Sequence, residues 1–396
     1  MKGLIRRAKP DGKTAGRLLI AALLVTLFSF LLFWRLGTLT DGLSPAEYKS
    51  RQNNNGVEQI VRNGLDAPLN LLQYGYTSGL GSSNAALRLA SVTAAVIIIL
   101  FLFLMLRSLF GMTVGLLALL IVGATPWGIL AARSAAPYVM MLWLIVPVAC
   151  FVLMGRAKRR TEIWWLLLCI ALAISLYTPG LVWFIAGAAL FSARRFSAVT
   201  QRINSVFLII GIAVAILALI PLAASLAVEP ARIKHLMLIP PDWPGLSETL
   251  KSLGWAFIGL FWSIRSHIDI GIGQLPMFNI LQSALLIFGI YALGSRMRNI
   301  TLALGAWLLL AVLLSGINNN PHLLLFGLPA AGVLVAAGLR LLYIEWRRVF
   351  PLNPFAYALA MSLIILVVGA HLFYSIRYTL VAWPRTPETK ATYVLK

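Results

Sequence analysis

The chain alternates long apolar runs with short polar segments, and this pattern predicts a membrane protein built from helices. A helix that spans a bilayer needs about 20 mostly apolar residues, and several runs approach that length. They cover residues 18–36, 86–106, 112–127, 138–154, 163–177, 181–193, 204–226, 279–294, 301–316, 322–343 and 355–376. Only TPG at 178–180 divides the fifth run from the sixth. We therefore expect an all-α polytopic membrane protein with about 11 transmembrane helices.

The positive charges lie between these runs, and their positions predict the topology. Clusters of Lys and Arg occur in residues 1–17 and again as RAKRR at 156–160, RMR at 296–298 and WRR at 346–348. Cytoplasmic loops carry an excess of Lys and Arg. We therefore expect the cytoplasmic (inner) membrane, with the N-terminus inside and the C-terminus outside.

This topology divides the chain into three parts. Residues 1–17 form a basic cytoplasmic N-terminus, residues 18–376 form the membrane domain, and residues 377–396 form a polar outer tail at the surface, with Trp383 at the membrane interface.

The same topology gives two long outer loops, at residues 37–85 and 227–278, while the inner segments are short. In the second loop, SLGWAFIGLFWSI at 252–264 is too short to span and predicts an interfacial or re-entrant helix with Trp255 and Trp262 as anchors. Any chemistry is therefore expected on the outer face.

Composition narrows the class further. The chain is 60% hydrophobic and 11% charged, with 33 Lys and Arg against 12 Asp and Glu and a net charge of +21. The basic residues are broken into short clusters, which argues against nucleic acid as a partner. The two cysteines, Cys150 and Cys169, fall in apolar runs and indicate no disulfide framework. No nucleotide-binding loop, HExxH or CxxC motif is present, which argues against ATP-driven transport and zinc chemistry.

An ordered series of short motifs begins in the first outer loop and continues along the chain. They are GLSPAE at 42–47, DAPLNLLQYG at 66–75, ALRLASV at 86–92 and LRSLFG at 106–111, followed by TPWGILAARSAAPYVMMLWL at 125–144 and NNPHLLLFGLPAAG at 319–332. The order resembles the GT-C superfamily of integral-membrane glycosyltransferases, which includes the protein O-mannosyltransferases and the aminoarabinose transferases. The resemblance covers most of the chain, and its weight comes from the order and sidedness of motifs that are individually weak.

The resemblance implies transfer of a sugar from a polyprenyl-phosphate donor to an acceptor. In that family acids of the first loop do the chemistry, which points to Glu47 as base or metal ligand, with Asp41 and Asp66 as substitutes. Interfacial cations hold the donor phosphate, which points to Arg133, Arg88 and His322, with Tyr138 beside them. The implied partners are a polyprenyl-phosphate-linked sugar, membrane lipid and an acceptor; the resemblance implies no definite cofactor and is compatible with a divalent metal at Glu47.

Two alternatives stay open. The family's acidic pair reads Asp-Glu, whereas this chain has Ala46-Glu47. The absence of the first acid is compatible with a non-catalytic protein that binds lipid or glycan. The other alternative is a transporter of lipid-linked glycans. Individual residues also have simpler roles: Glu47 can pair with Lys49 or Arg51, and Arg88 can extend to the lipid headgroups.

Overall fold

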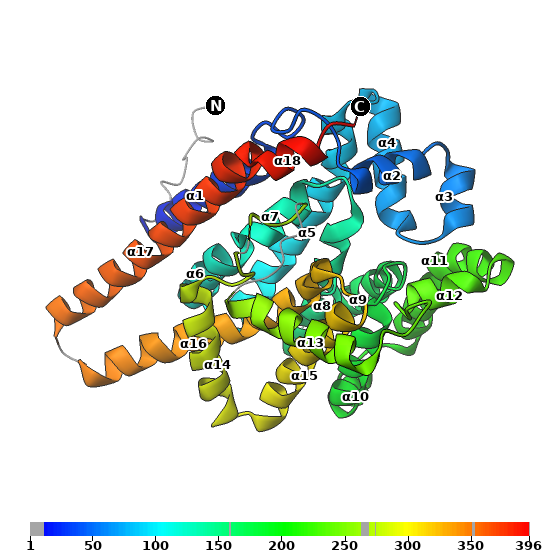
Figure 1. Cartoon of the computed structure of the whole chain (residues 1–396). Helices are drawn as coiled ribbons and strands as arrows, with labels where there is room; N and C mark the ends of the chain where they lie inside the picture. The colour runs from blue at the N-terminus through cyan, green and yellow to red at the C-terminus, as the bar shows by residue number, and fades with distance from the viewer. Residues whose placement is uncertain (1–11, 158–159, 263–268, 274, 351–352, 396) are drawn as a thin grey trace, which may run out of the picture.

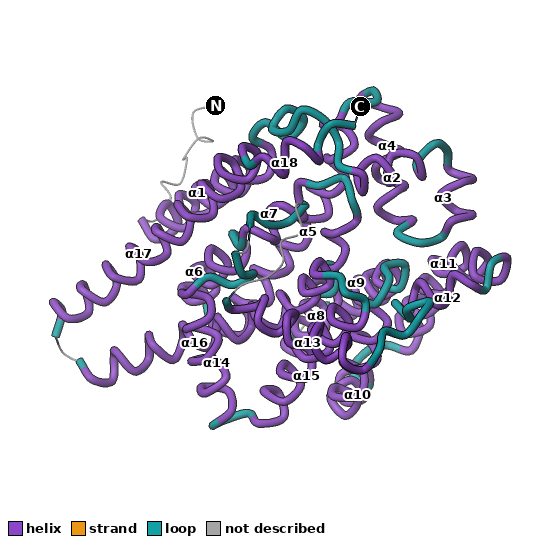
Figure 2. The backbone as a smooth tube through the Cα atoms, viewed as in Figure 1, coloured by secondary structure: helices purple, strands orange, loops and turns teal. Residues whose placement is uncertain are grey.

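The computed structural model describes residues 12–157, 160–262, 269–273, 275–350 and 353–395, which form helices joined by loops and turns (Figures 1 and 2). The helices are α1 (Gly12–Phe33), α2 (Pro45–Asn53), α3 (Val57–Asn63), α4 (Ala67–Leu80), α5 (Asn84–Phe110), α6 (Met112–Gly123), α7 (Pro126–Arg133), η1 (Pro137–Leu142), α8 (Ile145–Arg156), α9 (Thr161–Ser175), α10 (Leu181–Thr200), α11 (Ser205–Val228), α12 (Ala231–Leu236), α13 (Leu246–Phe261), α14 (Ile280–Gly294), α15 (Arg298–Ile317), η2 (Pro321–Gly327), α16 (Leu328–Val349), α17 (Pro354–Ile376), η3 (Arg377–Ala382), η4 (Trp383–Arg385) and α18 (Pro387–Thr392). The part of the chain described here contains no strand, only an isolated bridge between Leu43 and Leu395. The predicted all-α class is confirmed.

Seven of the described helices or helix combinations are long and apolar enough to cross a membrane, and an eighth span results if one bent pair is counted. Three further apolar helices are shorter, at Leu19–Phe33, Thr161–Ser175 and Ile280–Gly294. The membrane character is confirmed, whereas the count of about 11 spans stays a prediction.

The bent pair corrects the run predicted at 112–127. Helix α6 ends at Gly123, α7 begins at Pro126, and their axes differ by 66°. The cause is local, because a proline disfavours helical backbone in the residue before it and has no N–H to continue the helix. The bend turns α7 so that its last residue, Arg133, reaches the end of α1.

The core is centred on α16, which packs against α14, α6, α5 and α15. The contact between α14 and α16 is the closest in the array. A Cβ on Gly289 would overlap the carbonyl oxygen of Leu334, and a Cβ on Gly338 would overlap that of Leu285. Small residues at both positions let the two backbones touch, as is common between membrane helices.

Residues 37–83, the α9–α10 turn and the described parts of residues 229–279 meet at one end of the array, which we call the loop end. The backbone N–H of Asp66 donates to Tyr177 O at 3.0 Å, and Gly180 N–H donates to Leu236 O at 2.8 Å. The turn predicted at 178–180 is therefore present and lies beside both long loops. Short helices α2, α3 and α4 fold the first loop over this end (Figure 1).

The structure buries part of the predicted tail, whereas Arg385, Glu388 and Lys390 are exposed and the outer position of the tail stays a prediction. The Trp383 and Tyr393 side chains are buried, and Leu395 pairs with Leu43 of the first loop. Helix α13 confirms a short helix within the second loop, although it begins at Leu246; residues 263 and 264 of the predicted segment lie outside the described residues. The C-terminal segment is therefore part of the loop end and does not lie free on the surface.

Candidate functional site

Glu47 is the centre of a buried junction in the first loop. Its backbone N–H donates to Ser44 Oγ and its Oε2 accepts from the Ser44 backbone N–H, each at 3.3 Å, which is a capping box at the start of α2. Arg88 donates from Nε to Oε1 at 3.0 Å and from Nη2 to Oε2 at 2.8 Å. The backbone N–H of Ala135 donates to Oε1 at 2.8 Å. Both oxygens of the carboxylate are therefore engaged by the protein itself.

The two arginines predicted to hold phosphate are also engaged. Arg88 donates further to Leu36 O, Thr40 Oγ1 and Gly42 O, at 3.0–3.2 Å. Arg133 donates to three carbonyl groups at the end of α1, namely Leu31, Leu32 and Trp34, at 2.7–3.1 Å. Arg88 therefore fixes the chain that leaves α1, and Arg133 caps α1 itself.

Glu47, Arg88 and Arg133 line one small chamber together with Trp383 and Tyr393. Its volume is about 10 Å³, which holds about one water molecule. This space is too small for a phosphate or a sugar. The geometry therefore favours a positioning role for these three residues.

A row of polar side chains leads away from this chamber. Tyr393 lies against the Arg88 guanidinium, with 6.0 Å from Cζ to the ring centre, and donates its hydroxyl to Asp269 Oδ1 at 3.2 Å. Tyr138 donates to the other oxygen, Oδ2, at 2.8 Å. The Tyr138 ring stacks on His322 at 4.2 Å, and His322 Nδ1 lies 2.9 Å from Asn320 Oδ1. We call Tyr393, Asp269, Tyr138, His322 and Asn320 the polar row.

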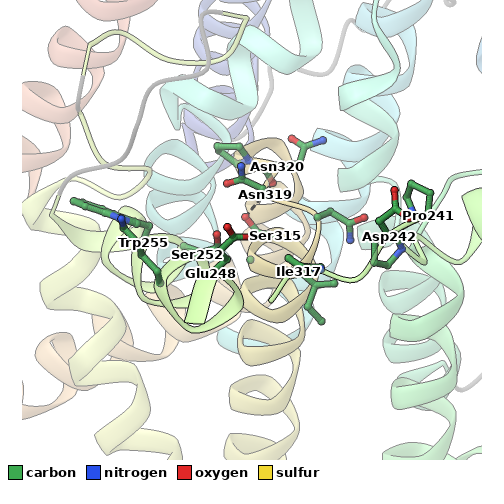
Figure 3. Close-up of a pocket in the computed structure, with 16 residues that line it drawn as sticks. Pro241, Asp242, Glu248, Ser252, Trp255, Ser315, Ile317, Asn319 and Asn320 are labelled. Carbon is green, nitrogen blue, oxygen red and sulfur yellow. Dashed lines mark hydrogen bonds between the residues drawn. The ribbon is translucent and has the colours of Figure 1, made fainter. Parts of the chain in front are cut away.

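The polar row ends at a cavity of about 560 Å³ (Figure 3). Glu248, Ser252 and Trp255 of α13 lie on one side, Pro241 and Asp242 on the other, and Asn319 and Asn320 between them (Figure 3). Lys251 adds a cation to the lining. The volume is typical of a pocket for a small ligand. Carboxylates, amides and an indole offer acceptors, donors and an apolar surface, which suit a ligand rich in hydroxyl groups.

One wall of the cavity is fixed to the helices around it. Asn318 Nδ2 donates to Leu238 O at 3.1 Å, and Trp183 Nε1 donates to Met237 O at 2.8 Å. Leu238 and Asn319 both have left-handed backbone conformations, with φ of +53° and +46°. Such a conformation in a leucine is rare, and here the leucine side chain packs on Gly180. The wall is therefore built rigidly from the second loop.

The other two predicted acids lie apart from the row. Asp41 is exposed. Asp66 begins α4 in a left-handed conformation with φ of +52°, and its Oδ1 is enclosed beside the α9–α10 turn. Burial raises the pKa of Asp66 to about 7, and the nearby Thr178 hydroxyl lowers it in part. Asp66 therefore serves the contact between the first loop and the α9–α10 turn.

Sequence reasoning missed Asp269, Tyr393 and the cavity acids, because only tertiary contacts bring them together. It brought Tyr138 and His322 to notice, and the structure stacks these two rings on each other. One signal was present: Ser44-x-x-Glu47 is the pattern of a capping box, which predicts a structural use of Glu47.

Within the described residues, no three His, Cys, Asp or Glu side chains are placed to hold a metal ion. The occupied oxygens of Glu47 do not fit the role of a metal ligand.

The helices are arranged as in the solved structures of two proteins, ArnT and AglB, and this chain therefore shares their fold. ArnT from Cupriavidus metallidurans matches in the apo state with a TM-score of 0.57 and 16% identity, over 94% of this chain and 74% of ArnT. ArnT bound to undecaprenyl phosphate matches with a TM-score of 0.58 and 14% identity, over the same shares of 94% and 74%.

The archaeal oligosaccharyltransferase AglB from Archaeoglobus fulgidus, solved with an inhibitory peptide and a dolichol-phosphate, matches with a TM-score of 0.55 and 14% identity, over 96% of this chain and 56% of AglB. No protein-family model and no curated protein sequence matches the chain. At these identities the likeness establishes the fold, and this chain spans little more than half of AglB.

Proposed function

We propose that the protein transfers a sugar from a polyprenyl-phosphate donor to an acceptor on the outer face of the cytoplasmic membrane. The observation that carries the proposal is the cavity of about 560 Å³ at the loop end of a GT-C fold, lined by acids, amides and an indole. In this proposal the cavity receives the sugar. ArnT has been solved bound to undecaprenyl phosphate and AglB in complex with a dolichol-phosphate, which supports a lipid phosphate as donor.

The reaction follows from the chemistry of such a donor. The acceptor oxygen or nitrogen forms a bond to C1 of the sugar, and the bond from C1 to the phosphate oxygen breaks. The electron pair leaves with the polyprenyl phosphate, and the acceptor proton passes to a carboxylate. Asp269, at the middle of the polar row, and the cavity acids Asp242 and Glu248 are the carboxylates available in this region. Lys251 is the cation of the cavity that can meet the phosphate.

The other predicted residues take supporting roles in this proposal. Glu47, Arg88 and Arg133 hold the first loop on the helices, since their hydrogen bonds go to the protein. His322 and Tyr138 lie between the cavity and Asp269 and position them relative to each other.

The test is transfer of label from a panel of radiolabelled polyprenyl-phosphate sugars by the purified protein in lipid nanodiscs. We expect transfer by the wild type and a loss of at least tenfold in Glu248→Gln and Asp242→Asn, with unchanged thermal unfolding. Glu58→Gln is the matched control, because its side chain is 84% exposed on α3 and remote from the cavity lining. Equal transfer by all four proteins would remove the cavity from the proposal.

A second function is favoured by one observation. Glu47 is fully engaged and Ala46 stands beside it in place of an acid, which is compatible with a non-catalytic protein that binds lipid-linked glycan. Donor binding that saturates, without transfer to any acceptor fraction, would establish this function. Absence of donor binding would exclude both functions.

A further inference from the structure

Two asparagines of the cavity lining lie at the two ends of one turn. Asn318 follows the last residue of α15, Asn320 precedes the first residue of η2, and both line the cavity of about 560 Å³. Between them, Asn319 has a left-handed backbone with φ of +46°. Asn319 and Asn320 are seen at the cavity in Figure 3. The turn therefore brings the side-chain amides of Asn318 and Asn320 to the same cavity.

The amide of Asn318 has a fixed orientation. Its Nδ2 donates to Leu238 O at 3.1 Å and to Leu314 O at 3.0 Å. Carbonyl oxygens can only accept, so the NH2 group has to face them. If the amide turned over, its oxygen would meet two other oxygens. The group that remains for the cavity is Oδ1, which is an acceptor.

The amide of Asn320 is fixed in the opposite sense. Its Oδ1 accepts from the backbone N–H of His322 at 3.1 Å and lies 2.9 Å from His322 Nδ1. A backbone N–H can only donate, so the amide oxygen has to face it, and the His322 ring then donates from Nδ1 to the same oxygen. The group that remains for the cavity is the NH2 of Nδ2, which is a donor.

Ser315 holds the backbone of Asn320 in place. Asn320 N–H donates to Ser315 O at 3.0 Å, and Ser315 Oγ donates to Asn320 O at 3.0 Å. Among the described residues, no hydrogen bond uses Asn318 Oδ1 or Asn320 Nδ2. The turn thus holds one acceptor and one donor in fixed orientations and leaves both for a ligand, and such preorganisation reduces the entropy lost on binding.

The charged side chains of the lining limit which ligand can bind. Asp242 and Glu248 carry two negative charges, and Lys251 carries one positive charge. None of the ion pairs among the described residues includes them. A sugar with a carboxylate would add an anion to a lining that is already negative, and like charges brought together weaken binding. The lining therefore favours a sugar without an acidic group.

We propose that Asn318 and Asn320 determine the specificity of the cavity for a non-acidic sugar with two free hydroxyl groups. One hydroxyl group donates to Asn318 Oδ1, and the other accepts from Asn320 Nδ2. A ligand that lacks either group leaves an amide without its partner, and a site built in this way rejects such analogues. This inference rests on the proposed function, in which the cavity receives the sugar of the donor, and it names what that sugar has to carry.

Fluorine distinguishes the two hydrogen bonds, because it is close to a hydroxyl group in size but can only accept. The measurement is saturation binding of undecaprenyl-phosphate hexoses to the full chain in lipid nanodiscs, with each ring hydroxyl replaced in turn by hydrogen or by fluorine. We expect replacement by hydrogen at two positions to weaken binding at least about tenfold. At the position that meets Asn318, fluorine should bind no better than hydrogen. At the position that meets Asn320, fluorine should recover affinity severalfold.

Asn320→Asp reverses the direction of one hydrogen bond with little change to the turn. The carboxylate keeps an oxygen for the two donors of His322 and places a second acceptor where the NH2 group was. We expect the recovery by fluorine to disappear in this variant, while the hydroxyl form, which can also donate, still binds. Asn319→Asp is the matched control for charge, because aspartate tolerates the left-handed backbone there. It should shift all affinities by one common factor and keep the recovery.

The wild-type series needs no variant, so the inference is tested even if Asn320→Asp folds poorly. Equal binding of all the hydrogen and fluorine forms would overturn the inference, and so would a recovery by fluorine that persists in a folded Asn320→Asp protein. The expected pattern of binding without any transfer would refute the proposed function and support the inference. Absence of binding by every hexose donor would overturn both.

Discussion

Arg88 Nη2 lies 2.8 Å from Glu47 Oε2, and the parallel bond from Nε to Oε1 measures 3.0 Å. The planar guanidinium thus meets the carboxylate with two donors, which is the strong geometry for this pair. The side chains of Arg88 and Glu47 are only 4% and 1% exposed. One residue belongs to the first loop and the other to α5, so the pair fixes the loop on the membrane helices.

Removal of either partner leaves a buried charge without its counter-ion. We expect Glu47→Gln and Arg88→Met each to lower the free energy of unfolding by about 3–5 kcal/mol, the usual cost of breaking a buried pair. Denaturant unfolding in detergent measures this. The exposed pair Glu58–Arg62 on α3 is the control, and its loss should cost less than about 1 kcal/mol. A Glu47→Gln protein with wild-type stability would contradict the positioning role.

Arg133 holds the end of α1 by three carbonyl groups. We expect Arg133→Ala to cost about 2–4 kcal/mol, because three buried acceptors lose their donors. Arg133→Lys should recover only part of this, since a single ammonium cannot copy the fork of a guanidinium. Proteolytic cleavage between α1 and α2 reports the loss directly. Equal cleavage of Arg133→Lys and wild type would show that charge alone is sufficient.

Asp66 gives a dependence of stability on pH. Its pKa is raised to about 7 in the fold from 3.8, so the folded state holds a proton that the unfolded state releases. The contribution of Asp66 to the free energy of unfolding is therefore complete below about pH 4. It is lost as the pH rises to about 7, by at most about 1.4 kcal/mol per pH unit. Asp66→Asn stays neutral and tolerates the left-handed backbone. Unfolding curves at pH 5 and pH 8 should differ more for the wild type than for this variant.

The α14–α16 contact has no room for a methyl group. We expect Gly289→Ala and Gly338→Ala to lower the free energy of unfolding by about 1–3 kcal/mol each, since the backbones must separate. Gly305→Ala on α15 meets open space and should be neutral or gain up to about 1 kcal/mol. Thermal unfolding in one detergent compares the three variants. A neutral Gly289→Ala would mean that the helices are less closely packed than described.

Hydropathy and local signals predicted much of the fold. The apolar runs located the membrane helices, and Thr178-Pro179-Gly180 became the predicted turn. The break at Thr125-Pro126 was not predicted, because the hydropathy of an apolar run is the same whether the helix continues or bends. In such cases the proline carries the information, and hydropathy does not.

The site was harder to predict because burial decides the use of a charge. Glu47 and Asp66 read alike as loop acids, yet one is held by an arginine from α5 and the other is enclosed next to Thr178. Asp269 meets Tyr138 and Tyr393 from distant parts of the chain. No local spacing encodes such a meeting, whereas the resemblance of the motifs at 125–144 and 319–332 had already pointed to Tyr138 and His322, which stack on each other.

The most enclosed helix is also among the last to be made. The span Pro321–Val349 has 94% of its apolar window buried, against 11% for Ser205–Val228. Its neighbours α5, α6, α14 and α15 all precede it in the chain. During synthesis these four helices are made before α16, so their inward faces have no partner until residue 349 has left the ribosome. A nascent chain that stops before Leu328 therefore exposes their inward faces, which makes it a natural target for membrane chaperones and quality-control proteases.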